Sequence, residues 1–454
     1  MISLMALTFS ILFLLVKPNE IQFPEAFVFA VVITAIISSY AYYELKSLVL
    51  ERMCIGLVLI SFVFAYPLSA VIHLWRPESD SRGFFDLVQD TGNNTLIWPS
   101  LGLVALALIA MVIGIKKQNK IYFNSYQKIS LVPRKIYLIF GLTLIMLGFY
   151  SNIVLFGSLE STISHMQVID RNTEIGGGIA RYFFFTRWLS WGLFALLGNV
   201  LLENKSKHKI LFFFILTVVF SLVNTFWGGG RVDGILATLP SLILLYKYQK
   251  VLLRASFLIL LFSLIPYIFF VTYLRSSQIG TDNLLLEVFD WQAGRFSMSG
   301  LAIAMVNEDG YAWGSTLFSE IIKLINAPFY LFSHNLLFKE IPGITNYCGR
   351  FLKGDIGLTG IVPGAICELY YNFGIIGVFT GFYFIGRFTV LVSRFVGAAK
   401  TVGSVATSSY LLVLICTAII PGTIFNWIYH FFTLGFPAIA LVIFEKFYSS
   451  RVLK

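Results

Sequence analysis

The sequence predicts an all-α polytopic membrane protein with about twelve transmembrane helices. Hydrophobic residues make up 57% of the 454 residues, charged residues make up 12%, and the mean hydropathy is +0.82. Soluble domains carry about 25% charged residues, so a water-soluble fold is excluded. The long apolar runs are continuous and do not alternate with polar residues, which predicts helices and excludes a transmembrane barrel.

Runs of about 17 to 22 mostly apolar residues are long enough to cross the hydrocarbon layer. We expect such spans near 2–16, 25–43, 53–74, 97–115, 136–156, 180–202, 210–227, 232–247, 255–274, 369–392, 403–420 and 430–445. The chain then divides into nine spans over 1–274, one large extracytoplasmic loop over 275–358, and a re-entry segment with three further spans over 359–454.

The distribution of basic residues predicts the orientation. Most of the 33 Lys and Arg residues fall in one alternate set of short loops, such as 116–120 and 205–209, and in the C-terminal tail. The positive-inside rule places these loops and both termini in the cytoplasm, and the 275–358 loop outside. The net charge of +10 is explained by these loops and does not indicate a nucleic-acid partner.

Residues 315–332 of the long loop are expected to form an amphipathic helix. Leu317, Ile321 and Ile325 recur at helical spacing, and Glu320 lies opposite them. Two positions are open for this helix: it lies along the outer membrane interface, or it packs on its own loop domain.

The chain lacks the phosphate-binding, metalloprotease and serine-hydrolase motifs of soluble enzymes. Its four cysteines show neither a disulfide framework nor a metal-binding spacing, so no metal and no cofactor are expected. The candidates for chemistry are ionisable residues at the outer membrane boundary, where charges are costly and are functional by default.

The tightest of these groups is the glycine-rich turn 228–234, which carries Arg231 and Asp233. Arg231 begins the next helix, where free backbone N–H groups favour an anion. Arginine also binds a phosphate through two parallel hydrogen bonds, so Arg231 suits a pyrophosphate. The alternative is that Arg231 pairs only with Asp233 and reaches the lipid headgroups.

Three further arginines are candidates for binding the same anion. Arg187 follows Arg181 by six residues, or about 9 Å of helix, and therefore predicts a polar cavity within the membrane zone. Arg275 directly follows the ninth span, and Arg295 follows one short segment later. Both arginines are expected to converge on an anionic headgroup, or else to be ordinary interfacial residues.

Glu368 is the candidate general base. It lies four residues before Asn372, so both occupy one helical face, and Pro363 and Gly364 just before it predict a helix start or a broken helix. The alternative for Glu368 is a structural salt bridge to one of the arginines, and Asp290 or His334 is an alternative base.

These features resemble the Wzy family of bacterial O-antigen polymerases. The resemblance rests on the number of spans, on the single large outer loop late in the chain, on the turn 228–231, and on the re-entry motif. It covers about 175–395 as motif and the rest of the chain as hydropathy. The re-entry motif reads Pro363-x4-Glu368-x-Tyr370-x-Asn372-Phe373-Gly374-x2-Gly377.

The resemblance implies a GT-C-like glycosyltransferase on the outer face of the bacterial inner membrane. Such enzymes transfer the growing glycan from undecaprenyl pyrophosphate to the non-reducing end of a new lipid-linked repeat unit, without a metal or a nucleotide sugar. A chain-length regulator of the Wzz type is a candidate partner. The catalytic residues are then Glu368, Arg231 and Arg275, and the substrate-binding residues are Arg187, Arg295, Asn372, Asp233, Tyr370 and His334.

Two other functions compete with polymerisation. O-antigen ligases usually carry His-Asn where this chain has Pro363-Gly364, although His334-Asn335 nearby keeps a ligase open. A flippase of lipid-linked oligosaccharides is expected to show repeated halves, and no such symmetry is visible.

Overall fold

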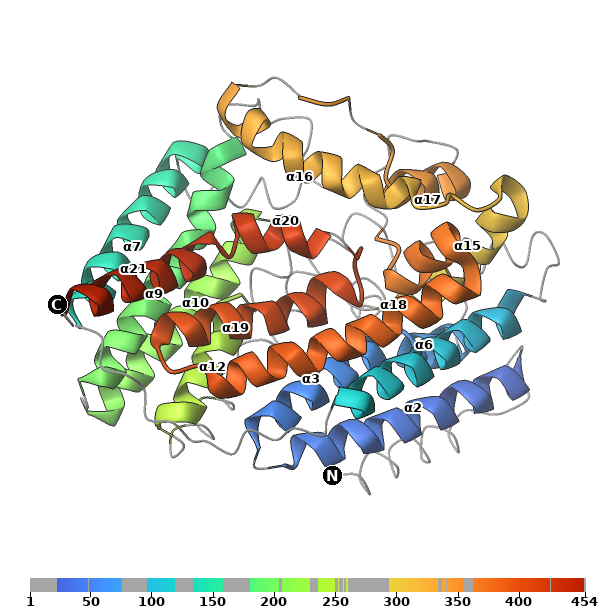
Figure 1. The fold of residues 1–454 in the computed structure, drawn as a ribbon, viewed down its shortest axis with the longest axis horizontal. Coiled ribbons are helices and arrows are strands. Elements are labelled where there is room, and N and C mark those ends of the chain that lie inside the picture. The colour runs from blue at the N-terminus through green and yellow to red at the C-terminus, as the bar shows by residue number, and fades with distance from the viewer. Residues whose placement is uncertain are drawn as a thin grey trace.

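The computed structural model describes residues 23–47, 49–75, 96–118, 134–157, 180–203, 206–228, 236–249, 294–333, 337–339, 341–353, 362–424 and 426–452, with 252, 256 and 259 as isolated positions. Every regular element in these ranges is a helix (Figure 1). The helices are α2 (Pro24–Leu45), α3 (Leu50–Ala65), α4 (Pro67–Trp75), α6 (Ile97–Gln118), α7 (Lys135–Phe156), α9 (Ala180–Leu202), α10 (Lys207–Gly228), α12 (Thr238–Tyr248), α15 (Phe296–Asp309), α16 (Ser315–Ser333), α17 (Ile344–Lys353), α18 (Ala365–Ala398), α19 (Val402–Leu414), the π-helix η4 (Ile415–Ile419), α20 (Asn426–Thr433) and α21 (Phe436–Val452).

Seven helical segments in the described part of the chain are long and apolar enough to cross a membrane. They are Pro24–Leu45, Leu50–Trp75, Ile97–Lys117, Lys135–Leu155, Phe185–Leu202, Ala365–Ala398 and Val402–Ile419. Each coincides with an expected span, so the chain is a multi-pass membrane protein. The spans expected near 2–16 and 255–274 lie outside the described residues, apart from isolated positions, and the total of twelve stays a prediction.

The single span expected near 430–445 is wrong, because the structure has two helices there. α20 ends at Thr433, and α21 begins at Phe436. Pro437 has no N–H to donate to the carbonyl of Thr433, so a continuous helix would lose a hydrogen bond at this point. The carbonyl of Leu434 instead accepts a hydrogen bond from the indole Nε1 of Trp191 at 2.9 Å.

Glycines let the long helices α6 and α18 pack closely. A Cβ on Gly114 of α6 would overlap the backbone of Tyr383 on α18, and a Cβ on Gly386 of α18 would overlap the backbone of Met111 on α6. Small residues allow backbones to approach in membranes, where van der Waals packing holds helices together. The α6–α18 pair is the part of the bundle that carries the re-entry motif.

α18 contains a sharp break at Gly374. Its φ of 64° and ψ of −151° lie in a region that is essentially accessible to glycine alone. The break brings Leu369 back toward the second part of the helix, since a Cβ on Gly377 would meet the carbonyl oxygen of Leu369 at 2.5 Å. The short first part of α18 carries Glu368, Tyr370 and Asn372 of the re-entry motif, and the long second part is apolar and long enough to span the membrane.

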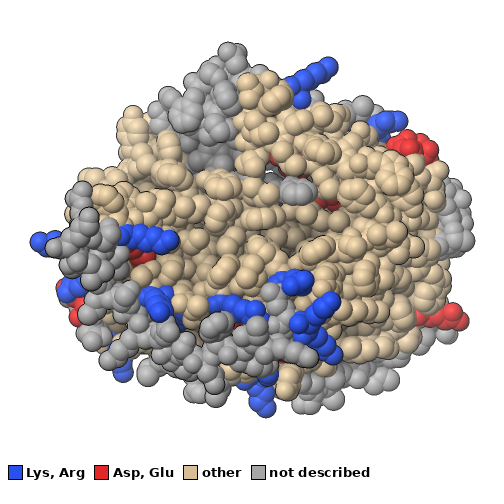
Figure 2. All heavy atoms as spheres, viewed as in Figure 1, with Lys and Arg blue, Asp and Glu red and all other residues tan. Residues whose placement is uncertain are grey.

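Basic side chains gather at one end of the bundle. Lys46 follows α2, Lys116 lies in the last turn of α6, Lys135 begins α7 and Lys207 begins α10. Most of the Lys and Arg side chains visible in Figure 2 lie along its lower and left edges, away from α16 and α17. The opposite end, where α18 begins, is called the site end below.

The site end is covered by helices from within residues 275–358. α15 packs against α18, α6 and α4, and it buries Phe296, Met298 and Leu301 completely. α16, the helix expected over 315–332, contacts α18 and α20 and lies across the top of the view in Figure 1. The division of the chain into one outer loop and two membrane parts stays a prediction.

Candidate functional site

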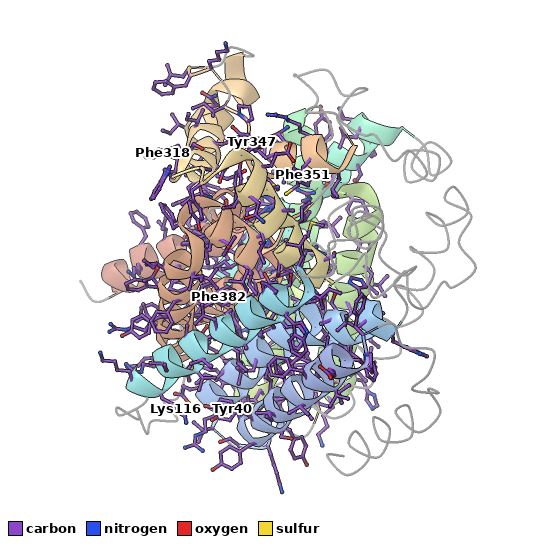
Figure 3. The ribbon with its side chains drawn as sticks, turned by 90° about the vertical axis from the view of Figure 1, so that its right-hand side faces the viewer. Tyr40, Lys116, Phe318, Tyr347, Phe351 and Phe382 are labelled. Carbon is purple, nitrogen blue, oxygen red and sulfur yellow. The ribbon has the colours of Figure 1, made fainter. Side chains whose placement is uncertain are left out.

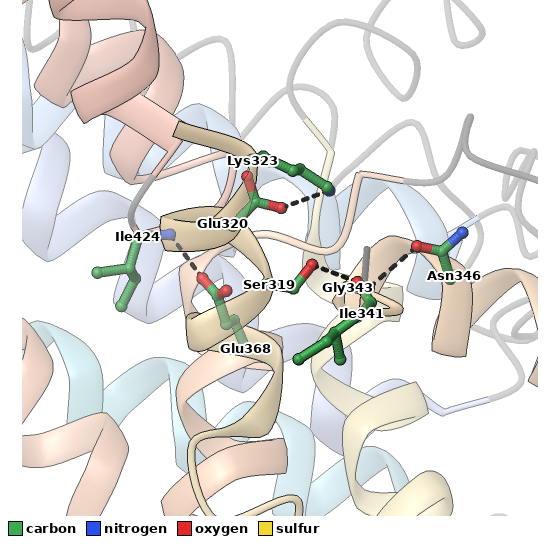
Figure 4. Close-up of polar contacts among 8 residues, drawn as sticks. All are labelled: Ser319, Glu320, Lys323, Ile341, Gly343, Asn346, Glu368 and Ile424. Carbon is green, nitrogen blue, oxygen red and sulfur yellow. Dashed lines mark hydrogen bonds and ion pairs between the residues drawn. The ribbon is translucent and has the colours of Figure 1, made fainter. Parts of the chain in front are cut away.

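The site is centred on Glu368, in the first turn of α18 (Figure 4). Its side chain is fully buried, and Oε2 accepts a hydrogen bond from the backbone N–H of Ile424 at 2.5 Å. Oε1 has no hydrogen-bond partner among the described residues. Within the same residues Glu368 forms no ion pair, so the alternative of a structural salt bridge finds no support there. A buried acceptor without a donor lowers the stability of the fold. Such an atom is typical of a position where a ligand or water binds.

The turn after η4 positions the donor to Glu368. At the start of this turn, the carbonyl of Ile420 accepts hydrogen bonds from the N–H of Ala365 at 3.2 Å and from the phenol of Tyr66 at 2.8 Å. The phenol oxygen of Tyr66 in turn accepts from the N–H of Ile366 at 3.2 Å. The turn is therefore tied to the start of α18 by three hydrogen bonds that do not involve Glu368. The π-helical η4 just before it is a feature often found at functional sites.

Arg295 is bound to the same turn. Its Nε donates to the carbonyl of Pro421 at 2.7 Å, its Nη1 donates to the carbonyl of Gly294 at 2.6 Å, and the residue is 5% exposed. A Cβ on Gly364 would meet the Cβ of Arg295 at 3.1 Å, so Arg295 lies against the start of α18. Arg295 therefore binds the carbonyl of Pro421 at one end of this short turn, and Glu368 binds the N–H of Ile424 at the other end.

Asn372 joins the re-entry motif to the α15–α16 connection. Its Oδ1 accepts from the N–H of Gly314 at 2.9 Å, and its Nδ2 donates to Oγ1 of Thr316 at 2.6 Å and to the carbonyl of Glu368 at 2.7 Å. Both polar atoms of this buried side chain therefore have partners. These contacts hold Asn372 between α18 and the α15–α16 connection, and its direct contact with a substrate stays a prediction.

Tyr370 lies beside the same connection. It is half-buried, and its ring centroid lies 6.3 Å from that of Tyr311. A Cβ on Gly374 would meet the phenol oxygen of Tyr311 at 3.0 Å, so Tyr311 fills the space that the glycine leaves. The break in α18 therefore serves as the docking point for this connection.

α16 places a charged pair over the buried acid. Nζ of Lys323 lies 2.9 Å from Oε1 of Glu320, and the fields of both residues act on Glu368. Figure 4 shows the pair on the side of Glu368 that faces α16, and Figure 2 shows acidic atoms in a recess below α16. Glu320 is buried although the sequence places it on the polar face of an amphipathic helix, so this polar face points toward the protein.

Arg187 faces the segment that follows the turn. Burial and the positive charge of Arg187 lower the pKa of His430 in α20 to about 4, so this imidazole is neutral at pH 7. Trp188, next to Arg187, stacks on Phe436 with ring centroids 5.6 Å apart. The segment from η4 to α21 therefore connects Arg295, Glu368 and Arg187, three of the residues that the sequence singles out.

Five of the predicted residues lie outside the described residues. These are Arg231, Asp233, Arg275 and the two alternative bases Asp290 and His334, and their places in the site stay predictions. Within the described ranges, no three His, Cys, Asp or Glu side chains gather as they would around a metal ion.

Several residues of the site carry no signal in the sequence. Ile424 contributes only its backbone N–H, and Tyr66 is one of 22 tyrosines. Thr423 has a buried Oγ1 without a partner among the described residues, next to the donor of Glu368. Of these contacts, the sequence gives a signal only for the ion pair of Glu320 and Lys323, because residues three positions apart are neighbours on a helix.

Comparison with known proteins identifies a family for the chain. The family model described as O-antigen polysaccharide polymerase Wzy matches residues 1–451. No curated protein and no solved structure matches the chain.

Proposed function

The chain belongs to the Wzy family of O-antigen polysaccharide polymerases, and from this we propose that it extends glycans carried on undecaprenyl pyrophosphate. The growing chain would leave its lipid carrier and join the non-reducing end of a new lipid-linked repeat unit. The site end of the bundle would face outward from the bacterial inner membrane, with both termini in the cytoplasm. The basic side chains at the opposite end of the described helices support this orientation.

Glu368 is the general base in this proposal. Its Oε1 takes the proton of the acceptor hydroxyl while the acceptor oxygen attacks the anomeric carbon of the growing chain. The bond from this carbon to the pyrophosphate oxygen breaks, and the pyrophosphate leaves with the electron pair. The observation that carries the proposal is the difference between the two oxygens of Glu368. Oε2 accepts a hydrogen bond from Ile424, and Oε1 has no partner among the described residues and is left for a ligand.

Cationic residues would stabilise the charge that develops on the departing pyrophosphate. Arg231 and Arg275 are proposed for this role from the sequence, with Asp233 and His334 as further contacts. Arg187 is the described arginine proposed to join them, because it faces α20 beyond the turn that holds Glu368. The chemistry needs no metal and no nucleotide sugar, since the phosphorylated lipid supplies both the donor sugar and the leaving group.

Arg295 is proposed to act through the turn. Its Nε and Nη1 already donate to the carbonyls of Pro421 and Gly294, and Pro421 lies three residues before the donor to Glu368. A guanidinium fixed in this way holds the carboxylate in place by holding its donor. Asn372 would act in the same way from the other side, by holding the α15–α16 connection.

The test is extension of a purified lipid-linked repeat unit by the purified full-length protein in liposomes. The proposal predicts a ladder of longer glycans that remain attached to the lipid, formed in the presence or absence of a chelator. A repeat unit whose pyrophosphate has been removed should not serve as the donor. Movement of the unit across the bilayer without extension would instead show a flippase.

A further inference from the structure

The polar and apolar faces of α16 are arranged in the reverse of a soluble amphipathic helix. Thr316, Ser319 and Asn326 on one face are 0%, 1% and 2% exposed. Phe318 and Ile325 on the other face are 61% and 40% exposed. In water the apolar face would be expected to turn inward, so another environment must cover it.

The inward face is fixed by its own hydrogen bonds. Oγ of Ser319 donates to the carbonyl of Ile341 at 2.7 Å. The amide of Asn326 donates to the carbonyl of Phe338 at 2.8 Å and accepts from its N–H at 3.0 Å. Rotating the helix to bury Phe318 would break these bonds and move the buried side chains of Ser319 and Asn326 out of the protein. The orientation of α16 is therefore part of the fold.

The exposed apolar face is continuous with the surface of a membrane-spanning helix. Trp313, just before α16, is 75% exposed, and a Cβ on the adjacent Gly314 would meet the ring of Phe373 at 3.3 Å. Phe373 leads directly to Ile375 and Ile376, which are largely exposed on the spanning part of α18. The side chains of a span that point away from the bundle face lipid.

We infer that α16 lies in the outer-leaflet interface, with Phe318 and Ile325 among the lipid acyl chains and its polar face closed over Glu368. The occupant of the apolar face is the bilayer itself. Figure 3 shows Phe318 pointing away from the helical body. Trp313 and Tyr311 at the start of the helix are the residue types that settle at the level of the headgroups. Of the two positions that the sequence leaves open for α16, the inference therefore selects the outer membrane interface over packing on the loop domain alone.

A single cysteine carrying an environment-sensitive fluorophore tests the inference in the full-length protein. Phe318→Cys and Ile325→Cys are compared with Glu308→Cys, at the exposed polar end of α15. The protein is placed in phosphatidylcholine–phosphatidylglycerol nanodiscs, with unaltered protein as the control for labelling of the native cysteines. The quenchers are a spin-labelled phosphatidylcholine in the bilayer and iodide in the water.

The inference predicts that the spin-labelled lipid quenches the fluorophore at positions 318 and 325 and that iodide does not. At position 308 iodide should quench strongly. Iodide quenching at 318 equal to that at 308 would overturn the inference. Protection of 318 from both quenchers would also overturn it, because protein, either a second copy or a partner, would then cover the face.

A second measurement links the lipid contact to the site, and it rests on the proposed function. Phe318→Asp should lose both the lipid contact of α16 and most of the polymer formed per molecule, whereas Phe318→Leu should keep both. Normal polymer with Phe318→Asp, together with lipid quenching at 325, would leave α16 in the interface but without influence on Glu368. The fluorescence result does not depend on polymerisation, so the two ideas fail separately.

Discussion

Ile424 donates its backbone N–H to Oε2 of Glu368 at 2.5 Å, across a separation of 56 positions in the chain. The donor lies in the turn after η4, and the acceptor lies in the first turn of α18. A hydrogen bond from a neutral backbone group orients the carboxyl group and brings no opposite charge to it. Among the described residues Oε1 has no hydrogen-bond partner, as the proposed general base requires.

Glu445 in α21 provides the structural contrast to Glu368. Its Oε1 accepts from the phenol of Tyr137 and from the N–H of Gly403, both at 2.7 Å, and its Oε2 accepts from Oγ1 of Thr401 at 2.5 Å. Every oxygen of this buried carboxylate is thus bonded to protein. Glu445 joins α7, α19 and α21 at the end of the bundle away from the site.

Glu445→Gln is predicted to lower stability and to spare catalysis. The amide of glutamine would face the N–H of Gly403 or the hydroxyl of Thr401 with a donor, and the lost charged hydrogen bonds cost about 1.5–3 kcal/mol. Thermal unfolding in detergent should show a lower midpoint, while the extension rate per folded molecule stays unchanged. A lower rate per folded molecule at normal stability would contradict the structural role.

Gly374→Ala is predicted to destabilise the break in α18. A non-glycine residue at a φ of 64° and ψ of −151° costs about 1–3 kcal/mol, and the added Cβ would meet the phenol oxygen of Tyr311 at 3.0 Å. Gly102→Ala in α6 is the matched control, since nothing lies within 4 Å of a Cβ there. This control should keep or raise the unfolding midpoint, because alanine is the better helix former. Equal midpoints for the two variants would argue against a required break.

Asn372 and Thr316 are predicted to be energetically coupled. Their side chains are joined at 2.6 Å, so Thr316→Val and Asn372→Ala should together cost less than the sum of their separate effects. Each side-chain hydrogen bond is worth about 0.5–1.5 kcal/mol. A double-mutant cycle measured by thermal unfolding checks this. Simple additivity would show that the hydrogen bond between Asn372 and Thr316 does not contribute to stability.

Arg295→Lys separates positioning from binding. A lysine keeps the positive charge but cannot donate from Nε to Pro421 and from a second nitrogen to Gly294 in the same geometry. If Arg295 positions the turn, kcat should fall while KM for the lipid-linked unit changes little. A rise in KM at unchanged kcat would instead show that Arg295 holds the substrate.

The membrane-spanning helices could be predicted from the sequence, because the lipid interior demands long apolar runs. Pro363 and Gly364 predict a helix start or a broken helix, and α18 begins directly after them at Ala365, but the break at Gly374 was not predicted. The break at Leu434–Gly435 was missed, although Pro437 carries the signal for it. Hydropathy alone does not distinguish one span from two short apolar helices.

The contacts inside the site could not be predicted. The partner of Glu368 is a backbone N–H, and a backbone group leaves no trace in the residue at position 424. The sequence also does not predict which face of α16 points toward the protein. Helical periodicity separates its apolar residues from its polar ones, but it does not tell whether lipid or water lies outside.

The central claim is that Oε1 of Glu368 accepts the proton of the acceptor sugar, and the rate of extension by Glu368→Gln tests it most directly. Glutamine can accept the hydrogen bond from Ile424 but cannot take a proton at neutral pH. The account predicts a fall in rate of about 10²–10⁴-fold, with a folded protein and with Glu445→Gln near the unaltered rate per folded molecule. A Glu368→Gln protein that extends the lipid-linked glycan as fast as the unaltered protein would contradict it.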